Sequence, residues 1–125
     1  MDNKKWKNKN FFEALKHSLA GIKYTFKNER NLKIQLIFGI LATGFGIYFH
    51  LTSIEFAVLF LVIGIVFFAE HINTAIEVML DLYSQDKNEI IKIAKDISSG
   101  AVLITSIMSV IIGCILFLPK ILNLF

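Results

Sequence analysis

The sequence predicts an all-α integral membrane protein, with an N-terminal amphipathic helix at the membrane surface followed by three transmembrane helices. Apolar residues make up 55% of the 125 residues, and only one proline occurs. Three apolar runs have roughly the length of about 20 residues that a bilayer-spanning helix needs. Most charged residues lie before or between these runs. This pattern favours one compact membrane domain and leaves no segment that could form a soluble core.

The single domain, residues 1–125, divides into a surface part and a membrane part. Residues 1–10 are polar and expected to be flexible. Residues 11–27 repeat apolar side chains every three or four positions, which indicates an amphipathic helix lying in the headgroup layer. We expect three transmembrane helices, at residues 32–51, 54–82 and 97–118. A cytoplasmic connector at residues 83–96 is expected between the second and the third. Pro119 is expected to end the third span, because proline lacks the N–H donor that continues a helix.

The distribution of basic residues predicts the topology. Of the thirteen Lys and Arg residues, nine lie before the first span or at its edge, and three lie in the connector. None lies between the first two spans, and only Lys120 follows the third. The positive-inside rule then places the N-terminus and the connector in the cytoplasm and the C-terminus outside. We expect a multi-pass protein of the cytoplasmic membrane, and we assign these charges to membrane topology and not to nucleic-acid binding.

Four polar side chains share one stripe of the second predicted span. Residues 70–81 read E-H-I-N-T-A-I-E-V-M-L-D, and the stripe consists of Glu70, Asn73, Glu77 and Asp81. On a helix that turns 100° per residue these positions fall on one side, while most apolar residues fall elsewhere. Ionisable residues inside a membrane helix are costly and mark functional sites by default. The stripe is therefore the candidate functional site.

The two glutamates of the stripe suit two different tasks. They are about 10.5 Å apart along the helix axis, which is too far for both to bind one small ion. Glu77 lies near the water interface, and Glu29, in the charged hinge at 27–33, is a natural second carboxylate for Mg²⁺. Glu70 lies about two turns deeper, where a carboxylate suits a general base facing a lipid alcohol. Asn73 between them can hydrogen-bond a carboxylate or a phosphate oxygen.

A candidate phosphate site lies at the start of the third span. Lys95 and Asp96 open this predicted helix, and a helix N-terminus beside a lysine favours phosphate. The spacing alone leaves three interpretations of the acidic stripe open: catalysis, an ion or proton path, and a structural polar seam. The sequence contains no phosphate-loop pattern, no protein-kinase signature and no zinc-ligand spacing.

Two motifs resemble the signature of a known family of small integral-membrane lipid kinases, the prokaryotic diacylglycerol kinase and undecaprenol kinase family. The family pattern is E-x-x-N-[ST]-A-[IV]-E-x-x-x-D, followed about a dozen residues later by A-K-D-x-x-[SA]-[AG]-A-V-L. Here the first part is residues 70–81 and the second is A-K-D-I-S-S-G-A-V-L at 94–103. The N-E-R-N segment at 28–31 also matches. The resemblance covers the chain from about residue 11.

This resemblance implies a homotrimer with active sites between subunits, Mg²⁺ as cofactor and ATP as co-substrate. It implies that Glu70 is the general base, that Glu29 and Glu77 hold the metal, that Ser99 lies near the lipid and that Asp81 completes the stripe. The implied nucleotide contacts are Glu29, Asn73, Glu77, Asp86, Lys87, Asn88, Lys95 and Asp96. They also include Asn10 and His17, which stand where the enterobacterial form has an arginine and a tyrosine.

The expected function is ATP-dependent phosphorylation of the hydroxyl of a membrane lipid alcohol at the cytoplasmic face. The F-K-N-E-R-N and I-N-T-A-I-E segments look more like the Gram-positive branch, which favours undecaprenol over diacylglycerol as the acceptor. The alternative is a small proton-coupled transporter or an accessory membrane subunit. That alternative accounts for the stripe, but not for Glu29 and the Lys95–Asp96 pair at the same membrane face.

Overall fold

The structure, a computed structural model, describes residues 7–83 and 88–125. Its elements are four helices: α1 (Phe11–Asn28), α2 (Arg30–Tyr48), α3 (Ser53–Tyr83) and α4 (Glu89–Leu122). Of these, α2, α3 and α4 are long and apolar enough to cross a membrane. The predicted all-α class with three spans is thus confirmed, and the part of the chain that is described contains no strand.

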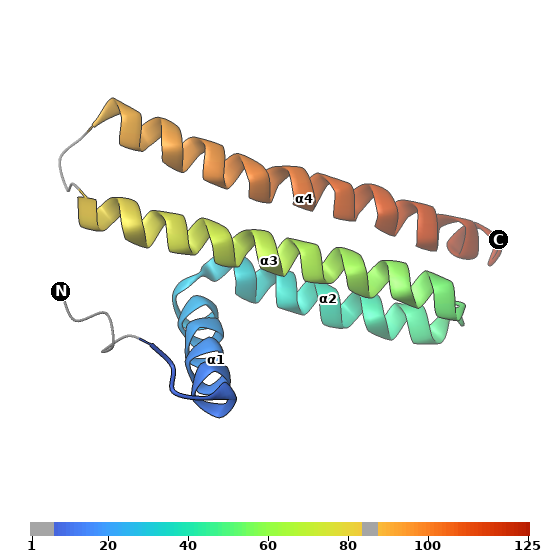
Figure 1. Ribbon diagram of the computed structural model, residues 1–125. Helices are drawn as coiled ribbons and strands as arrows, with labels where there is room; N and C mark the ends of the chain where they lie inside the picture. Colours follow the sequence, from blue (N-terminus) through green and yellow to red (C-terminus); the bar gives the residue numbers. More distant parts are fainter. Residues whose placement is uncertain (1–6, 84–87) are drawn as a thin grey trace.

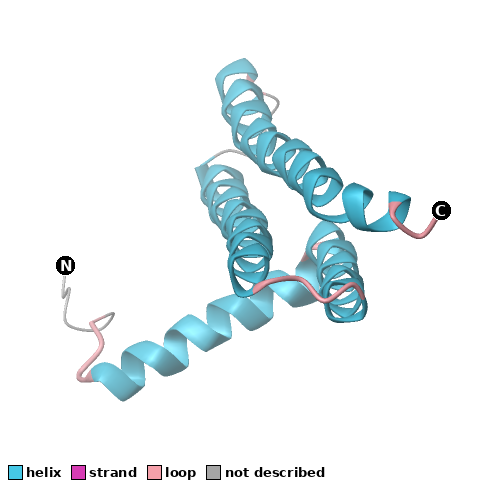
Figure 2. Ribbon diagram, turned by 90° about the vertical axis from the view of Figure 1, so that its right-hand side faces the viewer, coloured by secondary structure: helices cyan, strands magenta, loops and turns pink. Residues whose placement is uncertain are grey.

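The three long helices lie side by side, and α1 crosses them (Figure 1). The most extensive contact joins α3 to α4, which run antiparallel, while α2 packs along the N-terminal half of α3 (Figures 1 and 2). Because α3 has 31 residues and α2 has 19, the C-terminal part of α3 and the start of α4 continue beyond α1. We call this paired extension the stem. It carries the outer half of the acidic stripe.

A single residue separates α1 from α2. Glu29 has an extended conformation, with φ −102° and ψ 110°, and its backbone N–H donates to the carbonyl of Thr25 at 2.8 Å. The charged hinge expected over residues 27–33 is therefore helical except at Glu29. At the other end of α1, the side chain of Asn10 accepts a hydrogen bond from the backbone N–H of Glu13 at 2.9 Å, as an N-cap does.

The α2–α3 turn explains why α2 ends at Tyr48 and not at residue 51. His50 adopts a left-handed conformation with φ 55°, and the backbone N–H of Leu51 donates to the carbonyl of Gly46 at 3.0 Å. This is the hydrogen-bond pattern that closes a helix C-terminus. Thr52 and Glu55 then cap α3 reciprocally, with backbone-to-side-chain distances of 3.0 and 3.2 Å. Both ends of the turn are thereby fixed.

The apolar core lies at this turn end of the bundle. Leu51, Leu59 and Leu116 are buried together, and partly buried residues such as Phe56 surround them. Gly46 packs so closely here that a Cβ atom would lie 2.9 Å from both Leu51 Cδ1 and Phe56 Cε1. Gly46 therefore allows the end of α2 to pack closely against the turn and the start of α3.

Two predicted features of the third span are wrong. First, α4 begins at Glu89, so Lys95 and Asp96 lie nearly two turns inside the helix and do not open it. The side chain of Asn88 accepts from the backbone N–H of Ile90 at 2.8 Å and caps the helix early. The last eight residues of the predicted connector are therefore helical.

Secondly, Pro119 does not end the span, because α4 continues to Leu122 with the proline inside it. A proline costs a helix one N–H donor, but its fixed φ is itself helical. The last turn still closes, with the backbone N–H of Asn123 donating to the carbonyl of Pro119 at 3.2 Å. Only one turn follows the proline, so the helix needs few hydrogen bonds beyond it.

The close packing of Gly46 gives the first testable prediction. Alanine at position 46 must push Leu51 and Phe56 apart, and overpacking of this kind costs about 1–3 kcal/mol. Alanine at Gly44 meets open space and gains helix propensity of up to about 1 kcal/mol. We therefore expect Gly46→Ala to lower the free energy of unfolding in detergent micelles relative to Gly44→Ala. Equal stability of the two variants would contradict the packing at Gly46.

Candidate active site

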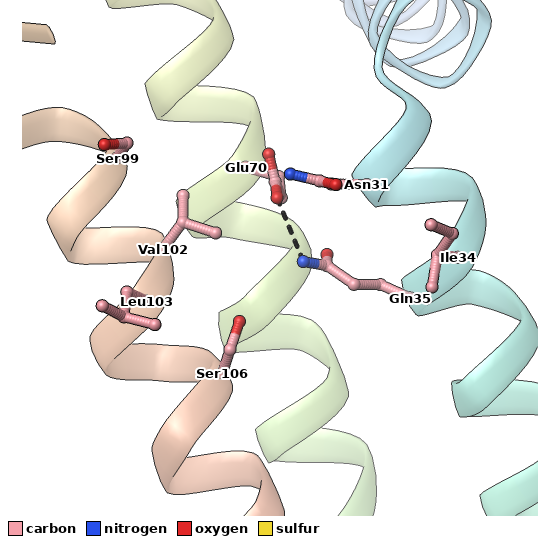
Figure 3. A pocket seen from close by; sticks show the side chains of 8 residues that line it. All are labelled: Asn31, Ile34, Gln35, Glu70, Ser99, Val102, Leu103 and Ser106. Atoms are coloured by element: carbon pink, nitrogen blue, oxygen red, sulfur yellow. Dashed lines mark hydrogen bonds between the residues drawn. The ribbon is translucent and has the colours of Figure 1, made fainter. Parts of the chain in front are cut away.

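The carboxylate of Glu70 lies in a pocket among the three long helices. Its side chain is only 1% exposed, although it sits in the apolar part of α3. The pocket has a volume of about 340 Å³ and is open on one side. Figure 3 shows the carboxylate between side chains of α2 and α4. The lining residues are Asn31, Ile34, Gln35, Glu70, Ser99, Val102, Leu103 and Ser106.

Gln35 is the hydrogen-bond partner of Glu70. Its amide Nε2 donates to Glu70 Oε1 at 3.0 Å, and among the described residues no other side chain donates to this carboxylate. Figure 3 also shows Asn31, one turn earlier on α2, with its amide nitrogen toward Glu70. The amide oxygen of Gln35 is buried and has no partner among the described residues. One glutamate oxygen is thus held, and the other remains free to accept a proton or a hydrogen bond.

The sequence analysis missed Gln35. A signal was available, because Gln35 is the one amide side chain in the otherwise apolar run from 34 to 49. A polar group in that position needs a partner, and the partner is the deepest acid of the stripe. The predicted lipid-side residue Ser99 lines the same pocket as Glu70, so the structure does bring these two residues together.

A second polar group joins α3 to α4 one turn closer to the stem. Ser98 Oγ donates to Asn73 Oδ1 at 2.7 Å, and Asn73 Nδ2 donates to Glu77 Oε1 at 3.3 Å. Asn73 and Ser98 are buried, while Glu77 is half-buried. Asn73 and Glu77 of the predicted stripe are therefore hydrogen-bonded to each other, and Glu77 lies nearer to water than Glu70.

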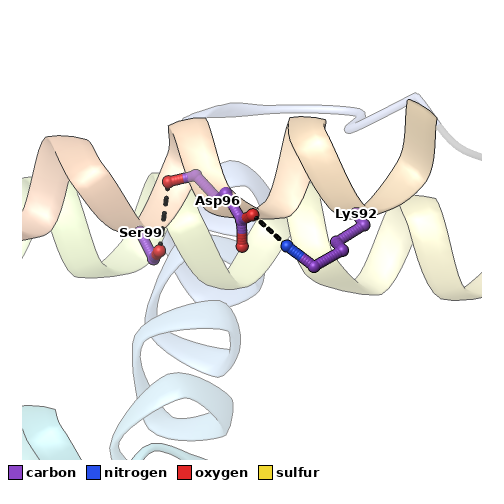
Figure 4. Close-up of polar contacts among 3 residues, drawn as sticks. All are labelled: Lys92, Asp96 and Ser99. Atoms are coloured by element: carbon purple, nitrogen blue, oxygen red, sulfur yellow. Dashed lines mark hydrogen bonds and ion pairs between the residues drawn. The ribbon is translucent and has the colours of Figure 1, made fainter. Parts of the chain in front are cut away.

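The stem carries two ion pairs. Lys95 Nζ lies 2.5 Å from Asp81 Oδ1 and links the last turns of α3 to α4. Lys92 Nζ lies 2.7 Å from Asp96 Oδ2 within α4. Figure 4 shows Asp96 between Lys92 and Ser99, whose hydroxyl donates to the carbonyl of Asp96 at 3.2 Å. All four charged groups are partly or fully open to solvent, where such pairs contribute little stability and exchange partners readily.

Two further carboxylates, those of Glu29 and Glu77, lie in the neighbourhood of Glu70. Glu29 is half-buried at the break between α1 and α2. The carboxylates of Glu29 and Glu77 both lie close enough to Glu70 to repel its charge. Glu29 and Glu77 thus lie in the neighbourhood of Glu70, and their shared metal-binding role stays a prediction.

Other predicted nucleotide residues do not join this group within one chain. Asn10 caps α1, and His17 Nδ1 makes a short hydrogen bond with Asn8. Figure 2 shows the start of α1 away from the three long helices. Asn88 is the N-cap of α4. Asp86 and Lys87 lie outside the described residues.

The donor set fits a magnesium ion that shares its coordination with phosphates. Within residues 7–83 and 88–125 no cluster of three or more His, Cys, Asp or Glu side chains could hold a metal by itself. Mg²⁺ characteristically takes one or two protein carboxylates and completes its shell with water and substrate phosphate oxygens. Glu29 and Glu77 would be two such carboxylates, and Asn73 Nδ2 donates to Glu77 Oε1.

Comparison with known proteins identifies the family. Residues 16–117 match the family model of prokaryotic diacylglycerol kinase. The chain is 38% identical over 116 residues to a diacylglycerol kinase of Synechocystis, a match that covers 92% of this chain but 66% of that protein. It is 37% identical over 122 residues to an undecaprenol kinase of Bacillus subtilis, covering 96% of this chain and 99% of that protein. A diacylglycerol kinase of Escherichia coli is 30% identical over 104 residues.

The three membrane-length helices and the kinase relatives together define the class of membrane lipid kinases. The family match covers most of the chain and agrees with this class. The chain belongs to the prokaryotic diacylglycerol kinase family, as the motifs at 70–81 and 94–103 indicated. It is therefore a kinase, and a kinase implies ATP as a substrate.

Loss of the Gln35 amide is expected to destabilise the fold. Gln35→Leu leaves the buried carboxylate of Glu70 without its donor, which costs about 1–2 kcal/mol in a membrane bundle. Thr43→Val is a matched control on the same helix, since Thr43 bonds only the carbonyl of Gly39 one turn earlier. Unfolding of the detergent-solubilised protein by SDS measures both. A Gln35→Leu variant as stable as the control would contradict the Gln35–Glu70 bond.

Proposed function

We propose that this enzyme transfers the γ-phosphoryl group of ATP to the hydroxyl of a membrane lipid alcohol at the cytoplasmic face. The observation that carries the proposal is the position of Glu70: a carboxylate 1% exposed, in a pocket of about 340 Å³ between membrane helices, with two more carboxylates toward the water. At the depth of Glu70, the hydroxyl of a lipid in the bilayer meets a nucleotide that arrives from the cytosol. A transporter does not need a carboxylate at the break between α1 and α2 in addition to the acids of α3.

Undecaprenol is the favoured acceptor, with diacylglycerol next. The relative named undecaprenol kinase is matched over 99% of its length, whereas the first diacylglycerol kinase is matched over 66%. The pocket walls from Ile34, Val102 and Leu103 are apolar and suit a lipid chain. The hydroxyls of Ser99 and Ser106 lie in the same pocket and suit the polar end of the acceptor.

In this reaction Glu70 acts as the general base. Gln35 holds one of its oxygens, and the free oxygen accepts the proton of the lipid hydroxyl. The lipid oxygen then bonds to the γ-phosphorus while the bond from that phosphorus to the β–γ bridging oxygen breaks, and ADP leaves. Burial keeps water from competing as the acceptor, since water in the pocket would lead to hydrolysis of ATP.

Glu29 and Glu77 hold Mg²⁺ of Mg-ATP, with Asn73 orienting Glu77. An ion held there would supply positive charge to offset the charge of the phosphate oxygens. Lys95 also binds the phosphates. Its ion pair with Asp81 is open to solvent, so Lys95 can exchange Asp81 for a phosphate oxygen as its partner. The remaining proposed nucleotide contacts are Asn88, Asp96 and the connector residues Asp86 and Lys87.

The active unit is a homotrimer in this proposal. Within one chain Asn10 and His17 are away from the acids, so a neighbouring subunit must supply them if they contact nucleotide. A groove of about 900 Å³ between α1 and α3 supports a partner, because its walls include exposed apolar side chains such as Ile22, Val78 and Met79. The basic residues flanking the spans support a cytoplasmic N-terminus and active site and an external C-terminus.

Transfer of radiolabel from [γ-³²P]ATP to extracted lipid tests the reaction. In mixed micelles we expect phosphorylated undecaprenol in quantity and a smaller yield of phosphatidic acid from diacylglycerol. A transporter or an accessory subunit would label neither lipid. A preference for diacylglycerol would support the kinase activity but would show that undecaprenol is not the favoured acceptor.

Two glutamine substitutions separate the roles of the glutamates. Glu70→Gln removes the base, so we expect kcat to fall at least about 100-fold, the usual contribution of a general base, with nucleotide affinity little changed. Glu77→Gln removes a metal ligand, so we expect a higher Mg²⁺ requirement and a higher KM for ATP. Loss of nucleotide binding in Glu70→Gln would instead assign Glu70 to the metal site.

A further inference from the structure

Two polar side chains are buried against each other between α3 and α4. Asn73 is 7% exposed and Ser98 is 6% exposed, and Ser98 Oγ lies 2.7 Å from Asn73 Oδ1. Buried polar groups require hydrogen-bond partners, particularly between membrane helices where no water competes. Ser98 was not among the predicted site residues.

Ser98 behaves differently from the other hydroxyl side chains of α4. A hydroxyl on a membrane helix ordinarily donates back to a carbonyl of its own helix. Ser98 instead donates across to α3, so its bond serves the neighbouring helix. The hydroxyls of α4 that follow the ordinary pattern are Ser99, Thr105 and Ser109, which donate to the carbonyls of Asp96, Val102 and Ser106.

The acceptor-only carboxylate of Glu77 decides the direction of this bond. An ionised carboxylate cannot donate, so the Nδ2 end of the Asn73 amide must face Glu77 Oε1, at 3.3 Å. The Oδ1 end then faces Ser98, which must be the donor. Ser98, Asn73 and Glu77 thus form a relay in which each hydrogen bond points the same way.

From this geometry we infer that Ser98 is a positioning residue for Glu77, acting through Asn73. Without the hydroxyl, Asn73 Oδ1 is a buried acceptor with no partner, and the amide is no longer held with its donor end on Glu77. Asn73 holds Glu77 Oε1, and among the described residues no hydrogen bond reaches Oε2, which is available to a cation. The inference rests on the proposed role of Glu77 in holding the magnesium of Mg-ATP.

Direct metal binding tests this role without turnover. Mn²⁺ replaces Mg²⁺ and is followed by electron paramagnetic resonance on the full chain in detergent, with a nonhydrolysable ATP analogue present. We expect Ser98→Ala to raise the Kd for Mn²⁺ about threefold to tenfold, the value of one net hydrogen bond. Ser109→Ala is the matched control, because Ser109 lies on the same helix and bonds only to it. It should bind Mn²⁺ as the wild type does.

A double substitution tests whether Ser98 acts through Asn73. In an Asn73→Ala background, adding Ser98→Ala should raise the Kd for Mn²⁺ no further, because the amide it orients is gone. A separate, additive loss would overturn the relay. The KM for the lipid acceptor should be the same in wild type and Ser98→Ala, whereas a general loss of packing between α3 and α4 would raise it and overturn the inference.

Glu77→Gln distinguishes failure of this inference from failure of the proposed function. If Glu77→Gln weakens Mn²⁺ binding and Ser98→Ala does not, the positioning role alone is wrong. If Glu77→Gln leaves Mn²⁺ binding unchanged, the metal role of Glu77 is wrong and the inference fails with it. Circular dichroism and size-exclusion chromatography in the same detergent establish that each variant compared is folded.

Discussion

A carboxylate inside an apolar helix bundle requires a donor, and the bond from Gln35 to Glu70 meets this requirement. It joins α2 to α3 at 3.0 Å in the middle of the bundle and keeps a 1% exposed acid compatible with the fold. The arrangement of the site follows from it. Because the amide occupies one oxygen only, the carboxylate is stabilised and still has a free oxygen facing a pocket. A fully satisfied acid would be structural, and an unsatisfied one would be too costly to keep.

Along α3 the polar residues change character with depth. Glu70 is paired with a neutral amide, Glu77 with the Asn73–Ser98 pair, and Asp81 with the charged Lys95. The partners are neutral where the stripe is buried and charged where it is open to water. This order is expected, because the free-energy cost of burying a charge rises with its distance from water. The same gradient suits a reaction between a hydroxyl that stays in the bilayer and a nucleotide that stays in water.

Much of this arrangement could be predicted from the sequence, because one helix sets the spacing of its own residues. The stripe at Glu70, Asn73, Glu77 and Asp81 needed only the helical period, and the spans needed only their length and apolarity. The partners from other helices could not be predicted in this way. Gln35 and Ser98 lie 35 and 25 residues from the side chains they contact, and only packing brings them together. The early start of α4 depended on the Asn88 cap, a local signal that the polar composition of the connector obscured.

The distribution of exposed apolar surface bears on how the site is completed. The long helices leave large apolar side chains exposed along most of their length, as lipid-facing helices do. The groove between α1 and α3 differs, because it runs beside the stem and its walls include Asp81 and Leu82 of α3 and Ile22 of α1. In the proposed homotrimer a second copy of the chain would cover this groove, because it offers an apolar helix face and basic residues near its N-terminus, and it would carry His17 toward the acids of the first chain.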